Sequence, residues 1–101
     1  MSYKIIWQPN SEMTYYEEAD FILRKWNGKE VYKFQSLVFD NIDRIIENPY
    51  IGKFEILLKI YMIVISKQTT LYYNINEKDR IINLLLFWNN SKNPADLTKL
   101  L

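Results

Sequence analysis

The chain has 101 residues, of which 49% are hydrophobic and 25% charged, and its formal net charge is +1. A chain of this size is expected to form one domain, residues 1–101, that buries roughly 60–70% of the surface exposed by the unfolded chain. The sequence contains neither cysteine nor histidine. This excludes disulfides, thiolate and imidazole metal ligands and a histidine general base, so any catalysis would depend on Lys, Arg, Tyr or carboxylate side chains.

The sequence carries no motif for a cofactor, and we expect the protein to bind none. Its two glycines are isolated and cannot form a phosphate-binding loop. Acidic pairs such as Glu17-Glu18 lie on an expected helix surface without matching ligands, so no metal site is expected. Residues 1–6 do not resemble the start of a signal peptide, and the longest apolar run, 56–65, is too short to span a bilayer. We therefore expect a cytoplasmic protein.

The first half of the chain predicts a strand followed by two helices. Residues 3–8 are β-branched and aromatic and end at Pro9, which predicts a first strand. Asn10 and Ser11 are candidate N-caps for a helix that ends at Asn27-Gly28, where either residue can adopt the left-handed conformation. The apolar positions of this helix recur at helical spacing; they are Tyr15, Tyr16, Ala19, Ile22, Leu23 and Trp26.

A second helix is expected from Lys29 to Glu47. Asn48-Pro49 ends it, because the residue before proline is driven out of the helical region. Two helices joined by so short a loop must be antiparallel neighbours. The apolar stripe of the second helix consists of Val31, Phe34, Val38, Ile42, Ile45 and Ile46.

The second half of the chain changes to strand-like patterning. Residues 56–66, 69–76 and 80–88 are rich in β-branched and aromatic residues and are separated by hairpin-length breaks. We expect Asn93 to cap a short final helix with Pro94 at its first position. The predicted fold class is α+β, with an N-terminal strand, an antiparallel helical hairpin, a three-stranded antiparallel meander and a short C-terminal helix.

Alternation along the last two strands predicts which side chains share a face. In the middle strand, Leu71, Tyr73 and Ile75 lie on one face, opposite Thr70, Tyr72 and Asn74. In the last strand, alternation groups Ile82, Leu84, Leu86 and Trp88, opposite Ile81, Asn83, Leu85 and Phe87. A strand that is apolar on both faces is either covered on both sides or open to a partner.

Four segments in this order resemble the RelE/ParE superfamily, particularly its shorter ParE-like members. They are "YKIIWQPNSE" (3–12), "ENPY" (47–50), "VISKQTTLYYNIN" (64–76) and "LLLFWNNSKNPADL" (84–97). The resemblance implies a RelE/ParE-like fold and the role of toxin in a bacterial type II toxin–antitoxin system, neutralised by a small antitoxin protein. It also implies either of two activities: RelE-like members cleave mRNA on the ribosome with Lys, Arg and Tyr side chains, whereas ParE-like members poison DNA gyrase.

The chain departs from the pattern of its presumed relatives at three positions that are often basic. Leu86 stands where an arginine is frequent, Ser91 where another basic residue precedes the Asn-Pro pair, and Tyr61 or Met62 where a third is expected. All three changes make the surface less basic than a nuclease requires.

Four residues are candidates for nuclease chemistry: Lys67, Arg80, Tyr72 and Lys92. Cleavage through the 2′-hydroxyl needs a base, an acid and a cation beside the phosphorane, so several of these groups would have to converge. Each also has a structural interpretation: a lysine at a hairpin tip for solubility, or a tyrosine packed across strands. Since Tyr72 and Tyr73 lie on opposite faces, only one is expected in the core, while Trp26 and Trp88 are expected as core anchors.

Three functions remain open at this point. The first is a ParE-like toxin that binds and blocks a protein target, which the resemblance implies to be gyrase. The second is a RelE-like, metal-independent and ribosome-dependent mRNA endonuclease, and the third is a non-toxic relic that still binds its antitoxin. An antitoxin strand or helix is expected across the second helix or the sheet. The candidate antitoxin-binding residues are Ile81, Leu85, Phe87 and Trp88.

Overall fold

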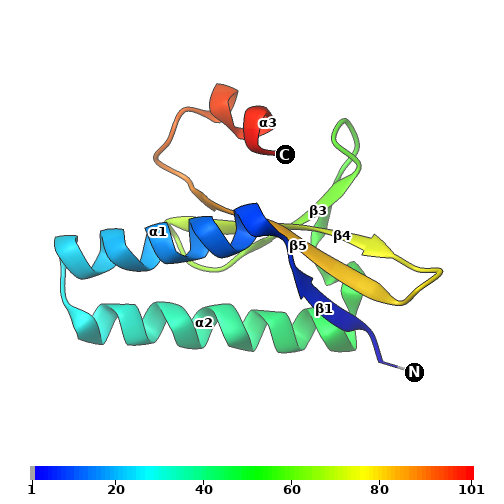
Figure 1. Ribbon diagram of the computed structural model, residues 1–101, viewed down its shortest axis with the longest axis horizontal. Coiled ribbons are helices and arrows are strands. Elements are labelled where there is room, and N and C mark those ends of the chain that lie inside the picture. Colours follow the sequence, from blue (N-terminus) through cyan, green and yellow to red (C-terminus); the bar gives the residue numbers. More distant parts are fainter. Residues whose placement is uncertain (1) are drawn as a thin grey trace.

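The computed structural model describes residues 2–101, which form an α+β fold of one sheet, two long helices and a short C-terminal helix (Figure 1). The elements in chain order are β1 (Lys4–Trp7), α1 (Pro9–Lys25), α2 (Gly28–Glu47), the 3₁₀ turn η1 (Pro49–Ile51), β2 (Lys53–Glu55), β3 (Ile60–Val64), β4 (Thr69–Asn76), β5 (Ile81–Asn89), η2 (Pro94–Asp96) and α3 (Leu97–Leu100). The predicted α+β class and the antiparallel helical hairpin are therefore confirmed.

The sheet is larger than the predicted meander. It has five strands in the order β1-β5-β4-β3-β2, and β1 pairs with β5 in parallel while every other pair is antiparallel. The N-terminal strand thus joins the same sheet on the far side of β5. This pairing gives β5 a strand neighbour on both edges over residues 81–84, whereas residues 86–89 pair only with β4.

The strand predicted over residues 56–66 forms only at residues 60–64, so a single strand across the whole range is not present. The chain makes a hairpin instead, in which β2 and β3 flank a turn of four residues, 56–59. Lys59 adopts a left-handed conformation (φ 56°), and its N–H donates to the Glu55 carbonyl at 2.7 Å. The turn raises Ile56 and Leu57 into solvent, with Leu57 89% exposed. Apolar residues seldom mark a turn, so the pattern gave no sign of one.

The caps differ from expectation at the start of each long helix. Pro9 occupies the first position of α1 and Gln8 is its N-cap, so Asn10 and Ser11 lie inside the first turn rather than before it. Proline suits this position because its φ is already helical. Asn27 does not take a left-handed conformation; it is extended and its side chain accepts from the Glu30 N–H, which makes it the N-cap of α2. The cap at Asn93 and the end of α2 before Pro49 are confirmed.

Both faces of the sheet are covered, and Figure 1 shows α2 and α3 on opposite sides of it. The larger core lies between the helical hairpin and the sheet and includes Val38, Ile45, Leu71, Tyr73, Ile82, Leu84 and Phe87. A smaller core on the other face consists of Ile60, Tyr72, Leu86 and Trp88, with Leu97 and Leu100 of the C-terminal helix packed against it. Tyr72 and Tyr73 are therefore both buried, contrary to the expectation that only one would be.

A β-bulge explains why the face assignment for the last strand fails. Tyr72 pairs with Leu86, but the next residue, Tyr73, pairs with Leu84, so Leu85 is an extra residue in β5. An inserted residue reverses the alternation beyond it. Ile82, Leu84 and Phe87 consequently face the helices, whereas Leu86 and Trp88 face α3.

Candidate functional site: a groove beside the helical hairpin

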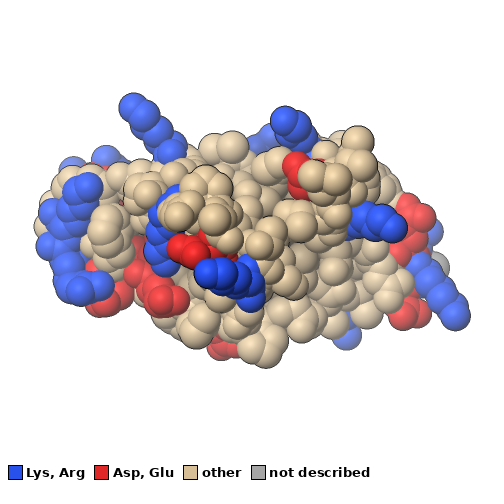
Figure 2. All heavy atoms as spheres, turned by 90° about the horizontal axis from the view of Figure 1, so that it is seen from above, with Lys and Arg blue, Asp and Glu red and all other residues tan. Residues whose placement is uncertain are grey.

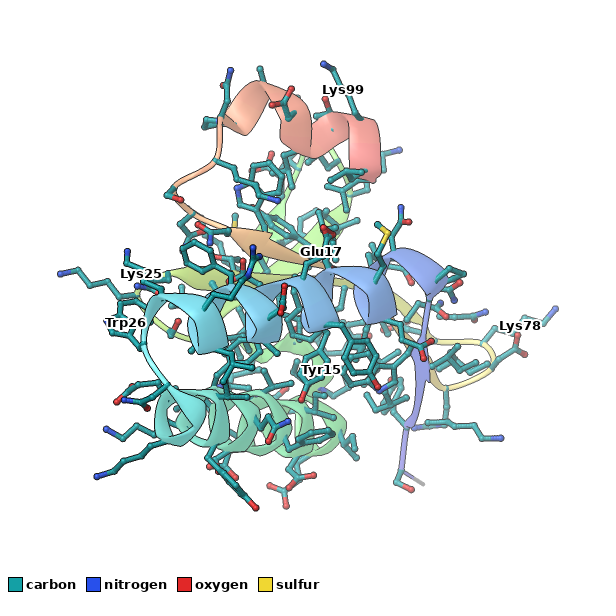
Figure 3. The ribbon with its side chains drawn as sticks, turned by 60° about the vertical axis from the view of Figure 1, so that its left-hand side comes forward. Tyr15, Glu17, Lys25, Trp26, Lys78 and Lys99 are labelled. Atoms are coloured by element: carbon teal, nitrogen blue, oxygen red, sulfur yellow. The ribbon has the colours of Figure 1, made fainter. Side chains whose placement is uncertain are left out.

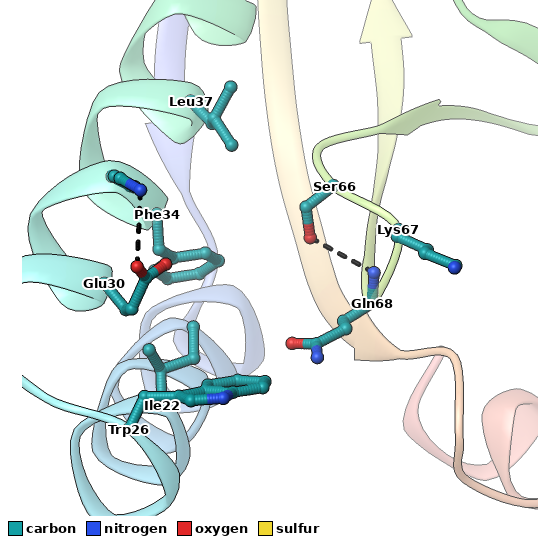
Figure 4. Close-up of a pocket in the computed structure, with 9 residues that line it drawn as sticks. Ile22, Trp26, Glu30, Phe34, Leu37, Ser66, Lys67 and Gln68 are labelled. Carbon is teal, nitrogen blue, oxygen red and sulfur yellow. Dashed lines mark hydrogen bonds and ion pairs between the residues drawn. The ribbon is translucent and has the colours of Figure 1, made fainter.

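An apolar groove of about 480 Å³ lies between the helical hairpin and the β3–β4 turn (Figure 4). We call it the hairpin groove. Ile22 and Trp26 of α1 and Phe34 and Leu37 of α2 form its apolar side. Its other residues are Ser66, Lys67 and Gln68 of the turn, with Glu30 and Lys33 at the rim.

Two of the four apolar wall residues are open to solvent. Trp26 is 45% exposed and Leu37 is 41% exposed, whereas Ile22 and Phe34 are buried beneath them. The expectation that Trp26 is a core anchor is therefore wrong. Trp26 follows α1 as its C-cap, where the chain leaves the helix, so its ring passes beyond the core. An exposed tryptophan beside an exposed leucine is typical of a surface that another polypeptide covers.

Hydrogen bonds hold the β3–β4 turn in place opposite the helices. Thr69, the first residue of β4, donates to the buried Glu18 carboxylate of α1 at 2.7 Å. Within the turn, the Gln68 N–H donates to Ser66 Oγ at 3.2 Å, and the Gln68 carbonyl accepts from the Asn90 N–H at 2.7 Å. The groove is thus bounded by elements that are tied to one another.

Basic side chains gather around one end of the groove. Residues 24–33 carry Arg24, Lys25, Lys29 and Lys33 against the single acidic residue Glu30. Figure 2 shows blue side chains concentrated at the end of the molecule formed by the α1–α2 turn. Lys33 pairs with Glu30 at 3.3 Å, and the Lys25 ammonium lies 4.8 Å from the centroid of the Trp26 ring. The rim is net positive, which favours an acidic partner.

The sequence-predicted candidates Lys67 and Arg80 lie far apart. Lys67 belongs to the turn before β4 and Arg80 to the turn after it, and a strand of eight residues spans roughly 25 Å. Figure 3 likewise places Lys78, in the Arg80 turn, at the opposite end of the molecule from Trp26. The Arg80 guanidinium carbon lies 5.6 Å from the centroid of the Tyr3 ring. These two cations do not share a site.

Tyr72 and Lys92 lie on the α3 side of the sheet. Tyr72 is buried, and burial, followed by the negative charge of Glu55, raises the pKa of its phenol. A raised pKa keeps this phenol protonated near neutral pH, so it has no free base form with which to accept a proton. The Lys92 ammonium is 6.0 Å from the centroid of the Trp88 ring, within the outer range of a cation–π contact. Neither residue lines the hairpin groove.

The four candidate antitoxin-binding residues are mostly inside the protein. Phe87 is 2% exposed beneath the helices and Trp88 is 5% exposed beneath α3, while Ile81 and Leu85 are half-buried. The apolar last strand is thus covered on both sides, the first of the two alternatives that its composition left open. A partner that contacts Trp88 must first displace α3.

The residues that sequence reasoning missed are those of the groove itself. Ile22, Trp26 and Phe34 were assigned to apolar stripes, but a stripe does not reveal which of its members reach beyond the opposing element. Leu37 lay outside the assigned stripe of α2. An apolar residue off the stripe was the available signal, because such a residue faces either solvent or a partner.

Two further features are absent from the described residues. Within residues 2–101, no three Asp or Glu side chains gather closely enough to hold a metal ion. None of the helices in that part of the chain is both long and apolar enough to cross a membrane.

Comparison with known proteins finds no matching family model and no matching relative among curated proteins. The family resemblance accordingly stands on the four sequence segments quoted above.

Proposed function

We propose that this protein is a cytoplasmic toxin of the RelE/ParE type that arrests growth by binding a protein target and is neutralised by a cognate antitoxin. DNA gyrase is the target that the ParE-like resemblance implies. The observation that carries the proposal beyond resemblance is the hairpin groove, in which Trp26 and Leu37 remain exposed above buried Ile22 and Phe34. Exposed apolar side chains above a buried apolar layer are typical of a protein-binding surface.

The placement of the candidate catalytic groups supports binding over mRNA cleavage. Lys67 and Arg80 stand at opposite ends of β4, and Tyr72 is buried with a raised pKa. Acid–base cleavage requires its groups within hydrogen-bond reach of one phosphodiester. A toxin that acts by binding needs no convergent catalytic groups, so the separated positions of these residues are compatible with it.

The residues that line the groove indicate which kind of polypeptide segment would bind there. Its apolar walls accept an aliphatic or aromatic side chain, and Lys33 and Lys67 at its borders favour carboxylates on either side of that anchor. An amphipathic helix laid along α2 would present such a pattern. We assign this segment to the target, and the antitoxin would neutralise the toxin by competing for the same exposed face of the hairpin.

Inducible expression of the chain in a bacterium tests the proposal. We expect growth arrest accompanied by a DNA-damage response, while pulse-labelled protein synthesis continues in the first minutes. Replacing the groove residues in the double variant Trp26→Ala, Leu37→Asp should relieve the arrest, because the apolar anchor site is lost. Leu57→Ser is the matched control, since Leu57 is exposed and apolar but lies on the β2–β3 turn.

Three results would count against the proposal. Absence of any growth effect would favour the non-toxic relic, and rapid codon-placed mRNA cleavage would favour the RelE-like nuclease. If Leu57→Ser relieved the growth arrest as much as the groove variant does, the groove would have no specific role in the arrest. Circular dichroism of each purified variant separates loss of the groove from loss of the fold.

A further inference from the structure

A second hollow lies on the hairpin, at the end away from the hairpin groove. Its volume is about 340 Å³, and four aromatic residues and one carboxylate line it: Trp7 of β1, Tyr15, Tyr16 and Glu12 of α1, and Phe39 of α2. We call it the aromatic pocket. Tyr16 is 63% exposed and Phe39 is 51% exposed, so the pocket opens to solvent while Tyr15 closes its base.

The rings stand at steep angles and form walls rather than a stack. Tyr15 meets Trp7 at an interplanar angle of 82°, Tyr16 at 73° and Phe39 at 70°, with centroids 5.4, 5.3 and 6.4 Å away. Trp7 and Phe39 are inclined at 45° with centroids 6.3 Å apart. A group that enters the pocket therefore meets several rings from different directions, which is the arrangement that recognises organic cations.

The charge around the aromatic pocket is negative. Residues 5–23 contain four acidic residues and neither Lys nor Arg. Glu12 has no ion-pair partner in the described part of the chain. On α2, Asp40 follows Phe39 and Asp43 lies one turn further on, whereas the following cation, Arg44, donates to the Asn41 side chain at 2.9 Å.

The partial charges at the ends of the two helices do not reverse the negative charge around the aromatic pocket. Glu12 lies in the first turn of α1, whose N-terminal end carries positive partial charge. Because the hairpin is antiparallel, the negative C-terminal end of α2 lies at the same end of the molecule. The Tyr15 phenol stays protonated near neutral pH, since burial raises its pKa. Glu12 is therefore the charged group within the pocket.

We propose that the aromatic pocket binds a single cationic side chain, the guanidinium of an arginine or the ammonium of a lysine, from a partner polypeptide. The ring faces of Trp7, Tyr16 and Phe39 attract the cation, and the Glu12 carboxylate pairs with it. The pocket is distinct from the hairpin groove, whose rim is basic. The inference does not depend on the toxin proposal, because purified protein and a peptide suffice to test it.

The probe is a capped Gly-Ser peptide that carries one central arginine. The same peptide with citrulline, which keeps the size of arginine but lacks its charge, is the matched neutral probe. We expect saturable shifts of the Trp7 indole N–H signal in NMR titrations of ¹⁵N-labelled protein, with the Trp26 and Trp88 signals as internal references. The citrulline peptide should bind at least about fivefold more weakly, as expected for loss of the cation.

Variants of the protein locate the effect. Glu12→Gln removes the pocket charge without changing its shape and should weaken binding of the arginine peptide by roughly threefold to tenfold. Glu17→Gln is the control on the same helix, because Figure 3 shows Glu17 and Tyr15 on opposite sides of α1. Phe39→Ala, which removes a wall, should weaken binding of the arginine peptide as well.

The proposal would be overturned by any of three results. The first is equal affinity for the arginine and citrulline peptides, which would make the pocket simply apolar. The second is an equal effect of Glu12→Gln and Glu17→Gln, which would reduce the attraction to general surface charge. The third is the absence of a Trp7 shift at millimolar arginine peptide.

Discussion

Thr69 donates its hydroxyl proton to the buried carboxylate of Glu18 across 2.7 Å, and this bond joins the first residue of β4 to the middle of α1. Thr69 directly follows the β3–β4 turn, which forms one side of the hairpin groove. This polar contact, together with the burial of Ile65 in the larger core, fastens the turn to the helices. The contact gives a direct means of testing how rigid the groove must be.

Thr69→Val should lower the free energy of unfolding by about 1.5–3 kcal/mol, because a buried carboxylate loses a hydrogen bond. Thr69→Ser retains the hydroxyl and should lose less. Urea denaturation followed by circular dichroism measures both. A valine variant as stable as the wild-type protein would show that Glu18 finds another partner.

Gly52→Ala should destabilise the protein by more than a surface substitution does. A Cβ atom at Gly52 would lie 2.5 Å from the Tyr73 hydroxyl and 2.8 Å from the Met62 carbonyl oxygen, too close for any carbon. The Tyr73 hydroxyl itself donates to the Pro49 carbonyl and accepts from the Gly52 N–H. Gly28→Ala is the control, because a Cβ there meets nothing within 4 Å; equal losses for the two variants would contradict the argument.

Stability should fall at alkaline pH through the buried tyrosines. Burial is the main cause that raises the pKa of Tyr15, Tyr72 and Tyr73 above the ordinary 10.0. The unfolded chain therefore releases these protons first, so the stability is intact below pH 10 and declines as the pH rises through the higher folded values. Urea midpoints at pH about 8 and about 11 measure the decline, and Tyr73→Phe should make it shallower.

The short C-terminal helix should prove essential for covering the second face of the sheet. Leu97→Asp places a charge against the smaller core that includes Leu86 and Trp88, and we expect it to expose this core to solvent. A loss of about 1–3 kcal/mol follows from the apolar burial removed. Dye binding to exposed apolar surface checks this. Thr98→Asp, on the exposed side of the same helix, should have little effect, and equal dye binding by both variants would refute the role of Leu97.

The double variant Lys67→Ala, Lys92→Ala should arrest growth as strongly as the wild-type chain. A toxin that works by binding at the hairpin groove loses only one rim charge in this variant. Growth curves after induction, matched for protein level, provide the measurement. Loss of arrest together with loss of mRNA cleavage would instead identify the two lysines as catalytic.

The elements that the sequence predicts correctly are those whose periodicity agrees with local turn chemistry. The helical hairpin has two long apolar stripes, a proline at the start of one helix and an Asn-Pro pair after the other. The β2–β3 hairpin was missed because its turn consists of Ile, Leu, Leu and Lys, a run that reads as strand. The left-handed Lys59 and two hydrogen bonds to Glu55 close the turn: the Lys59 N–H donates to its carbonyl and the Leu57 N–H to its carboxylate.

The candidate sites were harder to predict than the fold, because a site depends on what lies opposite each residue. The last strand, whose composition left it open to a partner, is paired on both edges over residues 81–84, and its second face is covered by a helix of four residues. Trp26 and Trp88 have the same chemistry in the sequence, yet one is exposed and the other buried. The exposure of the two side chains differs because of tertiary contacts, and the periodicity of the sequence carries no information about such contacts.

Leu85 is an extra residue in β5, so the number of residues in this strand decides which of its side chains enter each of the two cores. Deleting one residue between positions 85 and 88 would leave the composition of the strand almost unchanged, but it would exchange the side chains offered to the helical hairpin and to α3. Phe87 would then leave the ring cluster that it shares with Trp7 and Tyr15. Substitutions that preserve hydrophobicity should thus be tolerated here more readily than single-residue insertions or deletions, and homologous sequences should keep a constant spacing through this strand.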